Sequence, residues 1–280
     1  MTLSSLNDSV LIIEPGHTEK NYWADLWRYR ELFIVLAWRD ISVRYKQTVF
    51  GIAWAVIRPF LTMVVFTVIF GHIAKLPSDG DTPYALMVFS AMLPWQLFSM
   101  VLSDTSQSLI DNVNLITKVY FPRLIIPIAT MVRAFIDFLV SFVILIVLMV
   151  WYRFIPGWSI CCLPFFVLIA LSASFGPSLL IASINVKYRD FRYVTPFIVQ
   201  FGLYISPVGF SSQVIPEKWR LLYSLNPMVG VIDGFRWCIL GKSSVIYWPG
   251  FGLSLLISVL FLWLGITRFR SMEKMFADLI

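Results

Sequence analysis

Six long apolar runs divide this sequence, and each is close to the length that a helix needs to cross a bilayer. A transmembrane helix requires about 20 apolar residues, because the hydrocarbon core is about 30 Å thick. The runs are continuous rather than alternating, which favours helices over a closed β-barrel. We therefore predict an all-α, polytopic membrane protein with six transmembrane helices. The predicted spans are residues 49–70, 83–103, 125–151, 163–184, 193–210 and 249–269.

The composition agrees with lipid as the solvent. Hydrophobic residues make up 59% of the chain, charged residues only 14%, and the mean hydropathy is +0.79. Soluble domains have about 45–50% apolar and roughly 25% charged residues. The net charge of +6 is scattered at the ends of apolar runs. Without a basic stripe it does not indicate a nucleic-acid partner.

Lysine and arginine residues near the span ends predict the orientation. Loops that stay in the cytoplasm carry an excess of these residues. One side of the predicted bundle has Lys20, Arg28, Arg30, Arg39, Arg44, Lys46, Lys118, Arg123, Lys187, Arg189, Arg192, Arg268, Arg270 and Lys274. The other side has fewer, namely Lys75, Arg153, Lys218, Arg220, Arg236 and Lys242. We therefore expect both termini to be cytoplasmic.

The polar segments complete the predicted organisation. Residues 1–21 are expected to form a mobile N-terminal tail, and residues 22–280 a single transmembrane domain. Aromatic and basic residues interleave over 22–48, which is typical of an interfacial helix. That helix is either a simple anchor or a gate at the cytoplasmic mouth. Between spans five and six, Asp233 and Arg236 make a lipid-facing helix unfavourable, so short re-entrant outer helices are predicted there.

Charges inside predicted spans are costly and rarely face lipid. Arg58 either binds an anionic head group or snorkels to the interface, unless the first span begins later than predicted. Arg133 and Asp137 are four residues apart and share a helix face. The simplest interpretation is a neutralising pair that holds neighbouring helices together.

Two further features suggest contacts with a partner or a polymer. Apolar residues recur at helical spacing over Ser108 to Tyr120, which predicts a short amphipathic helix. This helix docks either on a soluble partner or on its own bundle. The aromatic content of 16% is compatible with a glycan channel, since sugar rings stack on aromatic rings. Trp54 and Trp95 lie within spans and are the channel candidates.

Catalytic motifs are almost lacking in the sequence. No metal-ligand cluster, nucleophile elbow or phosphate-binding loop is visible, so we expect no metal, no bound cofactor and no enzymatic activity in this chain. An ion-driven transporter would favour carboxylates near the bilayer midplane, and Asp137 is the one good candidate. A membrane glycosyltransferase or phosphotransferase would need an acidic or histidine cluster at one interface.

Several short motifs follow one another along residues 30–240. They are Arg44-Tyr-Lys-Gln-Thr-Val-Phe-Gly51 with Trp54 and Pro59, Leu93-Pro-Trp95, Asn114-Leu-Ile-Thr-Lys-Val-Tyr-Phe-Pro-Arg123, Asn185-Val-Lys-Tyr-Arg-Asp190, Ser206-Pro-Val208 and Asn226-Pro-Met228. Taken together and in this order, they resemble the membrane permease subunit of ABC polysaccharide exporters, which export O-antigen, capsule and teichoic-acid chains. A permease of the same fold that exports drugs or lipids is the alternative.

The resemblance implies a homodimer with two separate ATPase subunits, on which ATP and Mg would be bound. It implies a polysaccharide linked to undecaprenyl diphosphate as substrate and an inner-membrane location. The helix of residues 108–120 would be the coupling helix, with Asn114, Leu115, Ile116 and Lys118 facing the ATPase. The cations available at the substrate entrance for the diphosphate are Arg44, Lys46 and Arg58.

Overall fold

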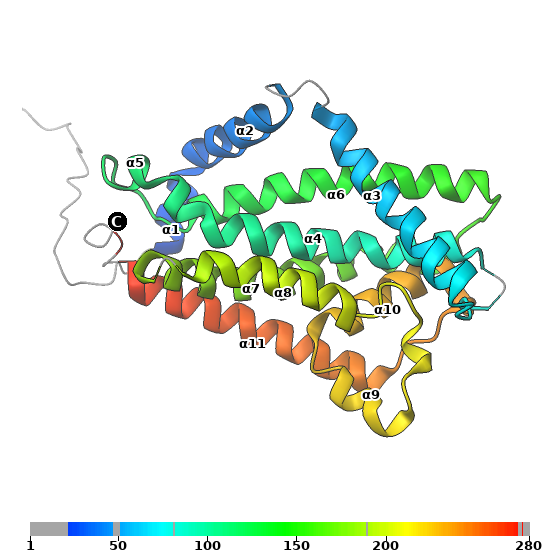
Figure 1. Ribbon diagram of the computed structural model, residues 1–280. Helices are drawn as coiled ribbons and strands as arrows, with labels where there is room; N and C mark the ends of the chain where they lie inside the picture. The colour runs from blue at the N-terminus through cyan, green and yellow to red at the C-terminus, as the bar shows by residue number, and fades with distance from the viewer. Residues whose placement is uncertain (1–21, 47–50, 81, 189, 274–275, 277–280) are drawn as a thin grey trace, which may run out of the picture.

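The computed structural model describes residues 22–46, 51–80, 82–188, 190–273 and 276. Every regular element within these ranges is a helix, which confirms the all-α prediction (Figure 1). The predicted N-terminal tail and the end of the predicted interfacial helix lie outside the described residues. The α-helices are α1 (Tyr22–Arg28), α2 (Arg30–Lys46), α3 (Gly51–Phe66), α4 (Tyr84–Asp111), α5 (Val113–Ile116), α6 (Ile125–Trp151), α7 (Leu163–Lys187), α8 (Phe191–Ile205), α9 (Glu217–Tyr223), α10 (Pro227–Leu240) and α11 (Trp248–Met272).

Short helical turns extend or connect these elements. A π-helical segment, η1 (Thr67–Ile73), continues α3. Three 3₁₀ turns precede or follow the later helices, namely η2 (Trp158–Cys162), η3 (Ser212–Val214) and η4 (Gly241–Ser243).

Among the described residues, five helices are long and apolar enough to cross a membrane. They are Val56–Ile73, Tyr84–Asp111, Ile125–Trp151, Trp158–Lys187 and Trp248–Met272. The prediction of a full-length fifth span is therefore not confirmed. Its helix, α8, has only 15 residues and ends before Ser206 and Pro207. At 1.5 Å per residue it is about 22 Å long, shorter than the hydrocarbon core.

The long helix α4 is the centre of the bundle. Within its membrane-spanning window 83% of the residues are buried, against 17% for the window formed by α3 and η1. It packs against α6, α7, α8 and α10. The buried side chain of Asn185 on α7 donates to the Ser106 carbonyl of α4 at 2.8 Å, which satisfies a polar group inside the core. The peripheral helix α3 runs obliquely across the bundle (Figure 1).

Glycines allow α7 and α11 to pack closely. A Cβ atom on Gly176 would lie 2.4 Å from the backbone of Phe261, and one on Gly265 would lie 2.4 Å from the Gly176 carbonyl oxygen. Neither position has room for a side chain. Small residues at a crossing let the backbones of membrane helices approach, which is a main source of packing energy in lipid.

The predicted interfacial helix is divided into two. α1 ends at Arg28 and α2 starts at Arg30. The Tyr22 ring of α1 stacks on the Arg270 guanidinium of α11, 4.5 Å from the ring centre, so α1 is held at the C-terminal end of α11. α2 lies inclined over the half of α6 nearest α1 (Figure 1). α1, α5 and the C-terminal end of α11 therefore share one end of the bundle, called the α1 end below; α9 marks the opposite, α9 end.

Candidate functional site

A polar cavity of about 500 Å³ lies under α2, between α2, α4 and α6. Its charged lining consists of Arg39, Asp40, Arg44, Asp104, Asp111 and Arg133. Positive and negative side chains are equal in number, so the cavity has no strong preference for one sign of charge. Such a cavity inside an apolar bundle suits water or a hydrated polar group.

The carboxylate of Asp137 attaches α2 to α6. Its side chain is only 2% exposed, and the Arg44 guanidinium of α2 lies 2.9 Å from it. The Tyr45 hydroxyl donates a hydrogen bond to the same carboxylate. Burial and the neighbouring Asp137 raise the pKa of the Tyr45 hydroxyl far above its ordinary value, so it stays protonated and remains a donor.

Two further polar contacts surround the same cavity. Arg133 of α6 forms an ion pair with Asp104 of α4 at 2.6 Å. Arg39 of α2 donates to the Asn112 side chain, just beyond α4, at 2.7 Å, and is 2.9 Å from Asp40. The N-terminal helix is thus joined to both core helices by charged groups.

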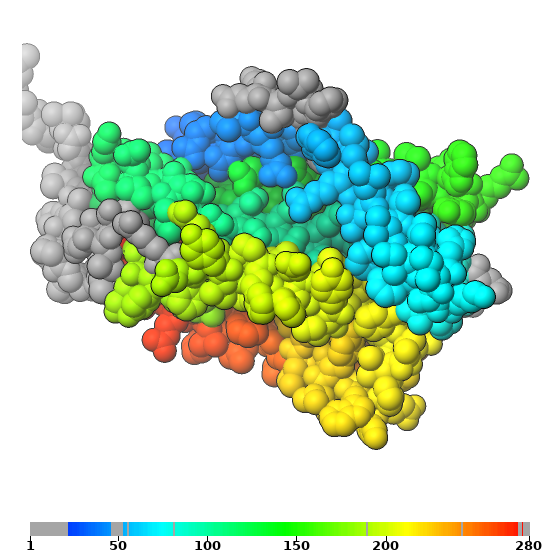
Figure 2. Space-filling model, in the orientation of Figure 1, coloured from blue at the N-terminus to red at the C-terminus, as the bar shows by residue number. Residues whose placement is uncertain are grey.

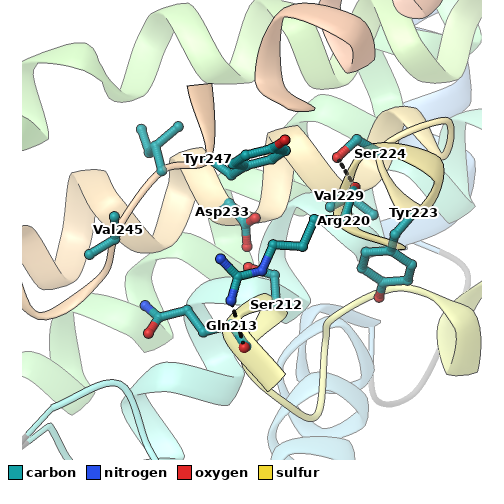
Figure 3. Close-up of a pocket in the computed structure, with 10 residues that line it drawn as sticks. Ser212, Gln213, Arg220, Tyr223, Ser224, Val229, Asp233, Val245 and Tyr247 are labelled. Atoms are coloured by element: carbon teal, nitrogen blue, oxygen red, sulfur yellow. Dashed lines mark hydrogen bonds between the residues drawn. The ribbon is translucent and has the colours of Figure 1, made fainter. Parts of the chain in front are cut away.

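The α9 end of the bundle has a second, smaller cavity of about 210 Å³ (Figure 3). It lies between the Ser212 and Gln213 turn, α9, α10 and the loop that precedes α11. Arg220 extends across it, and the Tyr247 ring and the Asp233 carboxyl border it (Figure 3). Sequence analysis marked Asp233 only as unfavourable in lipid. The cavity itself depends on four segments meeting, which no local pattern shows.

The sequence profile of ABC-2 type transporters matches residues 31–240 of the chain. The chain belongs to the ABC-2 type transporter family. It is similar to the O-antigen export system permease protein RfbA of Myxococcus xanthus, with 27% identity over 258 residues that cover 91% of this chain and 98% of that protein. Two Klebsiella pneumoniae proteins of the same name are 25% and 24% identical over 257 residues, covering 89% of this chain and 95% of each relative. The expected relation to ABC polysaccharide exporter permeases is confirmed.

Within this ABC-2 transporter chain, the predicted pair of Arg133 and Asp137 is formed differently. Both residues lie on α6, but Arg133 pairs with Asp104 and Asp137 pairs with Arg44. Each residue therefore has an ion-pair partner on a neighbouring helix, and the ion pairs of the described residues include none between Arg133 and Asp137. Partners on α2 and α4 approach α6 from two sides, and the spacing along α6 alone does not reveal them.

Among the predicted entrance residues, Arg44 lines the cavity under α2 and is paired with Asp137. Arg58 is exposed on α3, which begins at Gly51, and it is not among the described residues that line this cavity. The side chain of Lys46 lies outside the described part. The arginines that line the cavity with Arg44 are Arg39 and Arg133, which sequence analysis placed in other roles.

The predicted coupling helix is shorter than expected. Residues 108–111 belong to the end of α4, and α5 comprises only Val113–Ile116. Ile116 is 4% exposed and belongs to the chain's own core. Asn114 and Lys118 are exposed at the α1 end, and Leu115 is half-buried. Of the apolar positions in this pattern, Leu109 and Ile116 pack on the bundle itself, whereas Val119 is 48% exposed.

The two predicted channel tryptophans lie in different environments. Trp95 is 5% exposed and packs between α4 and α8, where its ring faces Gly202. A Cβ atom on Gly202 would lie 2.6 Å from the Trp95 ring, so Trp95 fills the core instead of lining a channel in this chain. Trp54 is 57% exposed on α3. Sequence analysis treated both alike because both stand in apolar runs.

One exposed aromatic stripe was missed. Tyr193, Phe197, Phe201 and Tyr204 lie at helical spacing on α8, and each is more than half exposed. The Phe197 and Phe201 rings are 4.2 Å apart. The opposite face of α8 carries buried Thr195 and the Gly202 that meets Trp95. The i, i+4, i+8, i+11 spacing was readable from the sequence, but only the structure shows which face is uncovered.

Metal-ligating residues do not converge in the described ranges. No group of three or more histidine, cysteine, aspartate or glutamate side chains there is placed to hold a metal ion. Asp233 is the carboxylate of the α9-end cavity, and the charged and polar groups near it are Arg236, Arg220, Ser212 and Asp79. The described cavities thus offer polar groups that are not arranged for metal-assisted chemistry.

Proposed function

We propose that this chain is the permease subunit of an ATP-driven exporter that moves a lipid-linked polysaccharide from the cytoplasmic to the outer side of the inner membrane. The observation that carries the proposal is the similarity to O-antigen export permeases over 98% and 95% of their own length. The polar cavity at the α1 end and the uncovered aromatic stripe on α8 support it. A hydrated glycan requires polar groups and ring surfaces along its path.

The α1 end faces the cytoplasm in this proposal. The excess of lysine and arginine near that end supports this orientation. The sequence has no phosphate-binding loop, so ATP hydrolysis takes place on two partner ATPase subunits. Exposed Asn114 and Lys118 beside α5 then form part of the surface that meets an ATPase.

A second copy of this chain completes the pathway. The helices α8 and α3, which carry the aromatic stripe and exposed apolar side chains, both lie on the side of the molecule shown in Figure 2. In a homodimer these two faces border the glycan path, with Trp54 from α3 and the α8 rings stacking on sugars. The short helix α8, followed by α9 and α10, then forms a re-entrant outer segment. Its buried polar groups are covered by protein, as membrane depth requires.

The diphosphate of an undecaprenyl-linked substrate enters at the cytoplasmic side. Arg58 is exposed on α3, where a charged head group is reachable. Arg44 becomes available when its pair with Asp137 opens. Lys46, two residues later, adds a third cation to this entrance.

Gene deletion followed by analysis of lipid-linked glycans tests the proposed function. Cells without this chain should accumulate one polysaccharide on its lipid carrier in the cytoplasmic leaflet and lose that polymer from the surface. Complementation with the wild-type chain should reverse both effects. Unchanged surface polymer and unchanged carrier-linked glycan in the deletion strain would contradict the proposal. Loss of a drug or phospholipid export phenotype instead would favour the drug or lipid exporter.

A further inference from the structure

The proposed export function assigns no role to the small cavity at the α9 end. Its wall combines a turn at Ser212 and Gln213, the helix α9 with Arg220 and Tyr223, Asp233 of α10, and Tyr247 before α11 (Figure 3). Its volume of about 210 Å³ is below the roughly 300–1,000 Å³ of sites for drug-sized ligands. It therefore has room for one small unit of a larger molecule.

Some polar groups in the wall are already engaged. Arg220 donates to the Ile215 carbonyl at 2.9 Å and to the Gln213 carbonyl at 3.0 Å. The positive charge of Arg220 lies near the Asp233 carboxyl, so Arg220 does not make the cavity a binding site for anions (Figure 3). Other polar groups in the wall can still form hydrogen bonds. Within the described part of the chain, the Gln213 side-chain amide and the Tyr247 hydroxyl have no hydrogen-bond partner.

The free groups indicate the class of ligand. Gln213 offers both a donor and an acceptor, Asp233 offers acceptor oxygens, and the Tyr247 ring offers an apolar face with a polar edge. A neutral ring that carries hydroxyl groups on adjacent carbons and C–H bonds on its faces matches this set. A phosphate would match it poorly because the basic group is used, and an acyl chain would leave polar groups unpaired.

We propose that this cavity binds one sugar unit of the exported polysaccharide at the outer end of the path, with Tyr247 stacking on the sugar ring and Gln213 and Asp233 binding its hydroxyl groups. The inference rests on the proposed export function and adds a site to it. One weakly held unit near the exit would oppose backward slipping of the polymer between ATP-driven steps.

The surrounding contacts keep this site in shape. The fully buried Arg236 of α10 donates to the Phe210 carbonyl at 2.8 Å and to the Val208 carbonyl at 3.2 Å. Tyr223 donates to the Ile205 carbonyl at 2.7 Å. These bonds fix the turn between α8 and η3, which positions Ser212 and Gln213. A site whose supporting groups are locked loses less entropy when it binds.

Site-specific photo-crosslinking in exporting cells tests the inference. Val245 lines the cavity and its side chain is exposed, so p-benzoylphenylalanine placed there reaches a bound sugar without disturbing the core. Trp219 is the matched control, because it is exposed on α9 but does not line the cavity. Phe201 on the α8 stripe serves as a reference for the path itself. The adduct is the permease carrying the strain's polysaccharide, detected with an antiserum against that polymer.

The proposal predicts a glycan adduct at position 245 at least about three times as strong as at 219. In the protein with the crosslinker at 245, Tyr247→Ala should lower the adduct yield about three- to tenfold, as expected for the loss of one or two weak contacts. Tyr247→Phe keeps the ring and should lower the yield less than about twofold. The amount of inserted permease and its retained ATPase partner serve as folding checks.

The outcomes separate the two proposals. An adduct at 201 without one at 245 would overturn the cavity's role and leave polysaccharide export intact. Equal yields at 245 and 219, or a yield that Tyr247→Ala leaves unchanged, would also overturn it, because the cavity would then hold only water. If gene deletion leaves the surface polymer unchanged, the export function fails first and the subsite fails with it.

Discussion

Arg44 of α2 and Asp137 of α6 form an ion pair of 2.9 Å, and the Tyr45 hydroxyl donates to the same carboxylate. The position of an N-terminal helix thus depends on a charge buried within a membrane-spanning one. A lone carboxylate in a span is costly, so α2 and Asp137 stabilise each other's placement. The pair is also reversible, because the Arg44 side chain is 36% exposed and has water as an alternative partner.

Opening of this pair should expose the cavity under α2. In a chain whose native cysteines are replaced, a cysteine at buried, cavity-lining Ser108 should react slowly with a polar maleimide in inverted vesicles. Asp137→Asn removes the charge and should raise the reaction rate several-fold. As a control, the exchange Arg44→Asp with Asp137→Arg restores a pair and should restore slow labelling. Equal rates in all three proteins would mean that the ion pair does not hold α2.

Substitutions of Lys118 and of Ile116 should have different effects on insertion of the permease and on its contact with the ATPase. Because Ile116 is packed in the core, Ile116→Asp buries a charge and should lower the amount of inserted permease. Lys118→Glu changes an exposed side chain and should leave insertion normal while lowering ATPase co-purification about tenfold or less. Quantitative immunoblots of membranes and of purified complexes measure both effects. Normal co-purification with Lys118→Glu would place the ATPase contact elsewhere.

The contact between Gly202 and Trp95 should be sensitive to one added methyl group. Gly202→Ala places a Cβ atom 2.6 Å from the Trp95 ring, so α8 must shift or the ring must turn. Overpacking of this kind typically costs about 1–3 kcal/mol. We expect a lower melting temperature of the purified permease with Gly202→Ala. Trp95→Phe in the same chain should recover part of the loss, and no recovery would show that the clash is not the cause.

Some structural features of this protein can be predicted from the sequence more accurately than others. The span 125–151 was predicted with the bounds that α6 has, because its apolar run is long and ends in polar turns. The end of α8 was placed too late, since apolar Val208 and Phe210 continue the run after Ser206 and Pro207 have ended the helix. An apolar run indicates that a segment is buried in lipid or in protein, but it does not indicate where the helix ends.

The site was less predictable than the fold. The sequence identified Arg133 and Asp137 as unusual in a span, but their partners come from α2 and α4. Ile116 was assigned to a partner surface although it packs inside. An amphipathic pattern shows that one face is covered without showing by what. Trp95 and Trp54 likewise needed tertiary contacts to be told apart.

Cysteine labelling should establish the orientation. Single cysteines at Ser78 and Gly157 lie in loops at the end opposite α1 and should label from outside intact cells. A cysteine at exposed Asn114, beside α5, should label only after permeabilisation. The reason is the excess of lysine and arginine near the α1 end. Labelling of Asn114 in intact cells would reverse the orientation and with it the direction of transport.

Arg58 should act as a graded binding group for the substrate's diphosphate. It is exposed on α3, and a diphosphate offers oxygens in the fork geometry that a guanidinium matches. Arg58→Lys keeps the charge but loses the bidentate geometry, so export per inserted permease should fall partly. Arg58→Ala should nearly abolish export. Basal ATP hydrolysis by the assembled complex should survive both changes, because the nucleotide sites lie on the partner. If Arg58 only snorkels to the interface, export per inserted permease will be equal in the wild type, Arg58→Lys and Arg58→Ala. Binding of the diphosphate must then depend on Arg44 and Lys46.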